Sequence, residues 1–395
     1  MEWSSTVSEE FSLRDAVDEA VGKIQDDLGP EPPDLAVAFI SAHHAPEYGD
    51  VPALVSKALR PRVLIGCSAG GVIGGGREVE DRIGFSLTAA RLPDVELVPF
   101  HVENEALPDL DAGPGAWEQL IGVEASQEPH LVVLVDPFSL QAENLLTGLD
   151  YAYPGSVKVG GLASGGSQPG SNALILGDRS LSKGAVGVAM HGNIRVDTVV
   201  AQGCRPVGKP AVVTKSRENL LLELDGRKPM EVLREIFEAS EDRDRSLLSS
   251  ALHLGVVMDP LKSDYRPGDF LIRNVMGIHQ ETEGLFIGEV LREGQVVQFH
   301  VRDAQTAADD LETLLSQYVA DHEGAVGSGA LLFSCLGRGK HLFGAADHDT
   351  GIFQSRVGDI PLGGFFCNGE IGPVGETTFL HGFTSSFGIF SPKSA

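Results

Sequence analysis

The stretch Gly363-Gly364-Phe365-Phe366-Cys367-Asn368-Gly369-Glu370-Ile371-Gly372-Pro373 is mainly apolar, is interrupted by four glycines and carries one carboxylate. Glycine occurs where the backbone takes a positive φ or approaches another group closely. A glutamate inside such a segment indicates that backbone amides and a carboxylate are presented together to a small ligand. The structural alternative is a glycine-rich strand end that packs closely against neighbouring backbone.

This stretch has a counterpart earlier in the chain, and two other apolar segments return at nearly the same offset. Self-similarity of this kind is typical of repeated structural units. We therefore expect two related halves, residues 1–229 with an N-terminal helix and residues 230–395. His101 and His300 occupy matching positions in the first matched pair, which favours a shared structural role. The matched pairs are Val98–Val102 with Val297–Val301, Leu131–Val135 with Leu331–Cys335, and Gly160–Ala163 with Gly363–Phe366.

The residue patterns favour an α/β fold, in which each half is a mixed, largely antiparallel sheet covered by helices. Apolar residues spaced like one helix face predict a helix near the N-terminus and another around residues 311–319. We expect the halves to pack into one body, with their glycine-rich strand ends facing one another at the junction. The expected hairpins join Phe85–Ala90 to Val95–Val102 and Leu285–Leu291 to Val296–Val301.

The composition describes a globular chain that is too long for one comfortable core, with 395 residues, 42% hydrophobic and 22% charged. Its 30 Lys and Arg against 56 Asp and Glu give a formal net charge of −26. Such a chain repels phosphate backbones and anionic lipid, so we expect neither nucleic acid nor a membrane as a partner. The four scattered cysteines, and the lack of a signal-like N-terminus or an apolar run long enough to span a bilayer, favour a cytoplasmic protein.

Two residues are candidate nucleophiles. Ser68 lies in Gly66-Cys67-Ser68-Ala69-Gly70, which matches the G-x-S-x-G turn of α/β-hydrolases. Cys335 ends an apolar segment beside Arg338 and Lys340, cations that lower a thiol pKa when they are close. A hydrolase or transferase using Ser68 or Cys335 is therefore the alternative function, although no partner base is recognisable in the sequence. A buried cysteine is more often an inert part of the core.

Metal and nucleotide sites are not indicated by the sequence. His341 with Asp347-His348-Asp349, and His43-His44, follow no recognised metal-ligand spacing, and Asp349 before Thr350 fits a turn or a helix N-cap. The glycine-rich runs lack the phosphate-binding motifs G-x-x-x-x-G-K-[ST] and G-x-G-x-x-G. We therefore expect no metal and no cofactor.

Several segments together resemble the FIST family, a sensory domain with FIST-N and FIST-C portions that occurs in microbial signalling proteins and in an F-box protein of animals. The resemblance covers nearly the whole chain and implies binding of a small ligand, an amino acid or related metabolite, rather than catalysis. It also implies a signalling protein as a possible partner. The segments that carry it are Leu64–Gly71, Val159–Gly166, Cys335-Leu336-Gly337-Arg338-Gly339 and Gly363–Pro373.

For an amino-acid-like ligand, both charges need an opposite charge in a partly dry site. Arg338 is expected to bind the carboxylate with two parallel hydrogen bonds, and Glu370 to receive the ammonium group. The alternative is that Arg338 and Glu370 bind each other and only join two loops. The expected ligand-binding residues are Cys67, Ser68, Gly70, Gly161, Ser164, Cys335, Arg338, Asn368 and Glu370.

Overall fold

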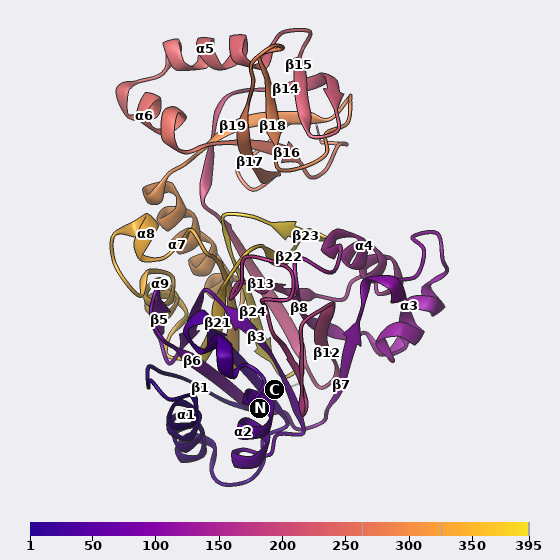
Figure 1. The fold of residues 1–395 in the computed structure, drawn as a ribbon, viewed down its shortest axis with the longest axis vertical. Coiled ribbons are helices and arrows are strands. Elements are labelled where there is room, and N and C mark those ends of the chain that lie inside the picture. Colours follow the sequence, from indigo (N-terminus) through magenta and orange to yellow (C-terminus); the bar gives the residue numbers. More distant parts are fainter. Residues whose placement is uncertain (263, 325, 394–395) are drawn as a thin grey trace. The chain divides into compact units, whose positions relative to one another are not determined.

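The computed structural model describes residues 1–262, 264–324 and 326–393 (Figure 1). The chain forms two compact units, of which unit 1 comprises Met1–Val200 with Leu311–Ala395 and unit 2 comprises Ala201–Asp310. Helices and mixed sheets occur together, so the α/β fold class is confirmed. The boundary expected between residues 229 and 230 falls in the first turn of α5 (Pro229–Ala239), within unit 2. The division of the sequence at that point stays a prediction.

Unit 1 contains three six-stranded mixed sheets. In spatial order, the first sheet is β1 (Glu2–Ser8), β6 (Phe85–Arg91), β2 (Leu35–Ser41), β3 (Val63–Ala69), β10 (Leu174–Leu176) and β11 (Arg179–Leu181). The second is β7 (Val95–Val102), β12 (Ala185–Gly192), β8 (His130–Val135), β9 (Lys158–Leu162), β22 (Glu370–Val374) and β23 (Thr377–His381). The third is β13 (Arg195–Gln202), β24 (Thr384–Ser391), β20 (Gly329–Cys335), β21 (Leu362–Cys367), β4 (Gly71–Gly74) and β5 (Arg77–Glu80).

The three sheets share one topology. Each has a parallel central pair, β2–β3, β8–β9 or β20–β21, with antiparallel neighbours on both sides. In each case the hairpin that follows the pair in sequence joins a different sheet. The β4–β5 hairpin, which follows β3, pairs with β21; β10–β11, which follows β9, pairs with β3; and β22–β23, which follows β21, pairs with β9. The sheets therefore exchange hairpins in a closed cycle.

The expected repeat is confirmed in two of its three matches, because β8 corresponds to β20 and β9 to β21. The structure adds a third copy, β2–β3, that the sequence comparison missed. The match between Val98–Val102 and Val297–Val301 is wrong, because β7 lies in the second sheet and β19 (Val296–Arg302) lies in unit 2. His101 and His300 are therefore not equivalent.

Both expected hairpins are also wrong. β6 pairs with β1 and β2, so both of its edges are occupied, and β7 pairs with β12 in another sheet. Likewise, β18 (Gly284–Ile287) pairs with β15 (Leu220–Leu224) and β17 (Phe270–His279), whereas β19 pairs with β14 (Cys204–Arg217) and β16 (Leu252–Val257). A turn-forming sequence between two strands shows that the chain turns there, and it does not show which strands pair.

The repeated glycines have a packing role in the parallel pairs. A Cβ atom at Gly66, Gly160 or Gly364 would lie 2.1, 1.8 or 1.9 Å from a carbonyl oxygen of the neighbouring strand. Each of these glycines stands opposite the residue that contributes that oxygen, in the register of the central pair. Close approach between the backbones of neighbouring strands thus explains these three glycines. For Gly364 this agrees with the structural alternative for the Gly363–Pro373 stretch, a glycine-rich strand end that packs closely against neighbouring backbone.

The three sheets enclose a common apolar core, in which Phe39 of β2 stacks on Phe365 of β21 at 4.6 Å between ring centroids. Helices cover the outer faces, and the apolar face expected near the N-terminus is confirmed in α1, which buries seven residues from Leu13 to Leu28. The helices that include residues of unit 1 are α1 (Leu13–Leu28), α2 (Val51–Ala58), α3 (Pro114–Ile121), α4 (Ala142–Ala152), α7 (Ala304–Asp321), α8 (Lys340–Phe343) and α9 (His348–Val357), with short 3-10 turns at Ala42–Glu47, Asn104–Ala106 and Ala125–Gln127.

Unit 2 is a closed antiparallel barrel with two helices, α5 and α6 (Asp242–Ser250). The strands follow the order β14 (Cys204–Arg217), β15 (Leu220–Leu224), β18, β17 (Phe270–His279), β16 (Leu252–Val257) and β19. Throughout the described ranges, no helix combines the length and the apolar character needed to cross a membrane.

Candidate functional site

The expected ligand-binding residues all lie in unit 1, at the ends of strands that the sheet topology makes equivalent. The N–H of Gly70, after β3, donates to Ser164 Oγ at 2.9 Å, and the Ser164 N–H donates to the Ser68 carbonyl at 3.2 Å. The Ser164 hydroxyl in turn donates to the carbonyl of Phe366 on β21. The glycine-rich ends of β3, β9 and β21 therefore meet.

The last glycine-rich segment completes this convergence. Glu370 pairs with Gly161 in the β22–β9 ladder, and a Cβ at Gly161 would lie 2.5 Å from Cys367 Sγ. Asn368 is exposed, and its Nδ2 donates to the Ala163 carbonyl at 3.3 Å. Among the expected residues, Asn368 thus presents its side chain at the surface where the strand ends meet.

Ser68 lies in a structural position and not at a nucleophile turn. It is a residue of β3 and is followed by β4, so the strand–turn–helix arrangement of the hydrolase motif is absent from residues 63–80. Its hydroxyl donates to Asn172 Oδ1 at 3.1 Å and accepts the Ala173 N–H at 2.9 Å. Both contacts join β3 to the chain just before β10.

The thiols differ in exposure. Cys67 and Cys367 are fully buried, and burial raises the pKa of both well above the ordinary value. The charge of Glu370 acts in the same direction on Cys367. Cys335 is half-buried at the end of β20, where it stands in register with Cys367 on β21. Cys67 and Cys367 are therefore protonated core residues at neutral pH.

Arg338 is fully buried and binds Asp349 with two parallel hydrogen bonds. Its Nε donates to Oδ2 at 2.8 Å and its Nη2 to Oδ1 at 3.0 Å. The same carboxylate accepts hydrogen bonds from the hydroxyls of Ser334 and Ser385, and contacts His348 Nδ1 at 2.9 Å. The sequence predicts a ligand carboxylate or Glu370 as the partner of Arg338, and not Asp349. Asp349 lies in the first turn of α9, after the N-cap residue Asp347.

The charges in this cluster stabilise one another. Burial opposes ionisation of both partners, but Arg338 holds the pKa of Asp349 below its usual range. Asp349, and to a smaller extent Cys335 and Glu370, raise the pKa of Arg338. Arg338 Nη1 is buried and has no hydrogen-bond partner among the described residues. One donor of the guanidinium thus stays available after Asp349 is bound.

Glu78 brings a second carboxyl group to the cluster from the β4–β5 hairpin. Its Oε1 accepts the Thr350 N–H at 2.8 Å, next to Asp349 on α9. Burial and repulsion from Asp349 raise the pKa of Glu78 to about 8. Glu78 Oε2 and Thr350 Oγ1 are buried and make no well-formed hydrogen bond with a described residue, although the Thr350 hydroxyl lies near enough to the Glu78 carboxyl to oppose part of the rise in its pKa. No residue pattern predicts this contact, because it depends on the hairpin exchange.

Glu370 is held separately. Its Oε2 accepts the N–H and the hydroxyl of Thr384 at 3.1 and 2.8 Å. Arg338 thus binds the Asp349 carboxylate with two hydrogen bonds, and Glu370 binds Thr384. Over residues 1–262, 264–324 and 326–393, no group of three or more His, Cys, Asp or Glu side chains is placed to hold a metal ion.

Comparison with known proteins agrees with this fold over most of the chain. The model of the FIST N domain matches residues 34–227, and that of the FIST C domain matches residues 229–373. An uncharacterized protein of Mycobacterium bovis is 37% identical over 377 residues, which are 95% of each chain. An uncharacterized protein of Mycobacterium tuberculosis is 37% identical over 386 residues, covering 97% of this chain and 98% of the relative. The chain therefore belongs to the FIST family, whose domains are regarded as sensors of small ligands.

Proposed function

We propose that this protein is a cytosolic sensor that binds a small polar ligand, an amino acid or a related metabolite, among the converging strand ends of unit 1. Membership of the FIST family supports the general class. The observation that carries the proposal is a set of three buried polar atoms without partners among the described residues: Arg338 Nη1, Glu78 Oε2 and Thr350 Oγ1.

Buried polar atoms that make no hydrogen bond cost about 1–3 kcal/mol each, so three of them in one cluster favour binding of a polar molecule there. At neutral pH the guanidinium donates, and Glu78, with its pKa raised to about 8, is mainly protonated and donates as well. Thr350 offers a hydroxyl. The cluster is therefore rich in donors and suits a ligand with acceptor oxygens, such as a carboxylate.

The remaining recognition groups lie on the neighbouring loops. Asn368 is the exposed polar side chain of the set, and Glu370, two residues later at the start of β22, supplies a carboxylate for an ammonium group. Ligand-dependent ordering of these loops would change the surface offered to a signalling partner. Ser68, in β3, and Cys335, at the end of β20, then have structural roles and do not act as nucleophiles.

The first experiment is a thermal-shift screen of the intact protein against amino acids and related metabolites. A ligand present at 100 times its Kd stabilises the folded protein by about 2.7 kcal/mol, which is readily detected. A reproducible, saturable shift with an α-amino acid supports the proposal. Shifts confined to ligands without a carboxylate would contradict the assigned chemistry.

The decisive variant is Asn368→Ala, because Asn368 is exposed and its loss should spare the fold. We expect ligand affinity to fall about tenfold, equivalent to about 1.4 kcal/mol. The matched control is Asn219→Ala in unit 2, where an asparagine also donates from Nδ2 to a carbonyl, that of Ile287, at 3.1 Å. Equal affinities for both variants and the unmodified protein would place the ligand elsewhere.

A further inference from the structure

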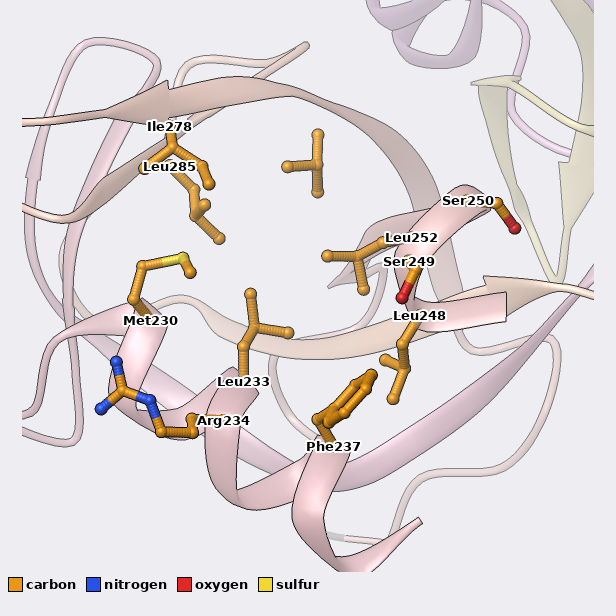
Figure 2. Close-up of a pocket in the computed structure, with 11 residues that line it drawn as sticks. Met230, Leu233, Arg234, Phe237, Leu248, Ser249, Ser250, Leu252, Ile278 and Leu285 are labelled. Carbon is orange, nitrogen blue, oxygen red and sulfur yellow. The ribbon is translucent and has the colours of Figure 1, made fainter. Parts of the chain in front are cut away.

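Unit 2 contains a cavity of about 530 Å3 between α5, the end of α6 and the strands β16, β17 and β18. Figure 2 shows apolar side chains from these elements facing a common open space. This volume lies within the range of about 300–1,000 Å3 that is typical of small-molecule sites. The apolar residues that line the cavity are Met230, Leu233, Phe237, Leu248, Leu252, Val275, Ile278 and Leu285.

The cavity exists because α5 packs loosely on the barrel. All residues of α5 are described, and only Pro229, at its start, is buried. Phe237 on α5 and Ile278 on β17 are 42% and 47% exposed although both line the cavity. Covering large, partly exposed apolar side chains with an apolar group stabilises the protein, because it removes apolar surface from water.

The rim of the cavity carries a cation. Arg234 lies one helical turn after Met230 on α5, and lines the same cavity. It is exposed and has no hydrogen bond or ion pair with another described residue. The nearby Glu283 carboxylate is bound by Lys228 at 2.6 Å, and this contact is the main cause of the lowered pKa of Glu283. Arg234 lowers the same pKa to a smaller extent. The guanidinium is thus available to an anionic ligand.

The polar groups elsewhere on the lining are weak acceptors and donors. Ser249 and Ser250, at the end of α6, donate their hydroxyls to the carbonyls of Arg245 and Ser246 at 2.8 and 2.9 Å. They bring no charge to the cavity. Among the lining residues Arg234 alone is charged, so the cavity combines an apolar interior with one positive group at its edge.

We propose that this cavity binds a small amphipathic carboxylate, whose hydrocarbon chain lies against α5 and the barrel and whose carboxylate contacts Arg234. The charge of the cavity rim indicates the class of ligand. A protein with a net charge of −26 repels anions, except where an unpaired cation such as Arg234 attracts them. This site lies wholly in unit 2 and is independent of the polar cluster proposed for unit 1.

The test is isothermal titration of the full chain with octanoate, decanoate and decanol, each below its micellar concentration. We expect one binding event per chain, and a gain of about fourfold in affinity per methylene, which corresponds to about 0.8 kcal/mol. Decanoate should bind more tightly than decanol because only decanoate contacts Arg234 as an anion. Absence of binding of both octanoate and decanoate at 1 mM, or binding without saturation, would overturn the proposal; the millimolar limit corresponds to about −4.1 kcal/mol.

Two variants separate the contributions of charge and cavity. Arg234→Gln should lower the affinity for decanoate about fivefold or more and change the affinity for decanol by less than about twofold. The control is Arg14→Gln, which changes an exposed arginine on α1 and should alter neither affinity. Ile278→Glu adds a carboxylate at the edge of the cavity and should weaken decanoate by at least fivefold. Unchanged decanoate affinity in both Arg234→Gln and Ile278→Glu would overturn this site. The amino-acid titrations of unit 1 should not respond to either variant.

Discussion

The helices α1 and α5 show two ways of using an amphipathic helix. α1, in unit 1, buries seven residues against the first sheet, whereas α5, in unit 2, buries only Pro229, although every residue of both helices is described. Both sequences have apolar residues at helical spacing, so the pattern alone does not reveal how tightly a helix packs. In unit 1 close packing also extends to the sheets, where glycines of the parallel strand pairs face carbonyl oxygens of the neighbouring strand.

The strongest test of this contrast is a methyl group added to a glycine of each unit. Gly364→Ala places a Cβ 1.9 Å from the Leu332 carbonyl oxygen, so we expect a loss of more than about 4 kcal/mol in unfolding free energy, or failure to fold. Gly277→Ala in β17 has no atom within 4 Å of the new Cβ and should change stability by less than about 1 kcal/mol. Urea unfolding followed by circular dichroism measures both. Similar losses would refute the difference in packing.

A second test compares one isoleucine on each helix. Ile24 of α1 is buried, and Ile24→Ala should cost about 3 kcal/mol, since it leaves a cavity in a close-packed core. Ile236 of α5 is half-buried, and Ile236→Ala should cost about 1 kcal/mol. Denaturant midpoints give the two values. A larger loss at Ile236 would mean that α5 is not loosely packed.

The smallest expected effect concerns pH and the polar cluster of unit 1. Unfolded Glu78 releases its proton near the ordinary pKa of 4.5, but in the folded protein it keeps it up to about 8. The folded state thus binds the extra proton between these values, and its stability falls as the pH rises through this window. Glu78→Gln cannot ionise and should therefore remove most of that fall between pH 5 and pH 8.

The control for this pH dependence is Glu143→Gln, which changes one exposed carboxylate on α4. Its stability profile should follow that of the unmodified protein. If the profile of Glu78→Gln did the same, the Glu78 carboxyl would be ionised in the folded state, and the account of the cluster as a set of donors would be wrong.

Local patterns in the sequence predicted the parts of the fold that local patterns determine. The face of α1, the α/β class and the correspondence of β8–β9 with β20–β21 follow from residue spacing and from repeated glycines. The β2–β3 copy was missed in the sequence comparison, and its segment Gly66-Cys67-Ser68-Ala69-Gly70 also matches the G-x-S-x-G turn of hydrolases. An apolar strand before each of the three glycine-rich ends was the available signal.

The candidate site was predicted less completely. The convergence of Gly70, Ser164 and the β21 end was expected from their shared place at strand ends, and the structure brings them into contact. The roles proposed for the nine expected residues stay predictions. Glu78 was missed because the pairing of β4 with β21 brings it beside α9, and residue spacing contains no record of such pairing. Asp349 lies only 11 residues after Arg338, but its pattern fitted a turn or a helix N-cap rather than an ion pair.

The closed cycle of exchanged hairpins has a consequence for synthesis of the chain. The second sheet requires β22–β23, which ends at His381, and the third requires β4–β5, which was made some three hundred residues before its partner β21. A nascent chain cannot complete the core shared by the three sheets until the segment through His381 has left the ribosome. Contacts of such long range slow folding and prolong the exposure of unpaired edges. Most of unit 1 therefore stays incomplete until β22 and β23 have been made, and its unpaired strand edges are open to wrong pairing during that interval.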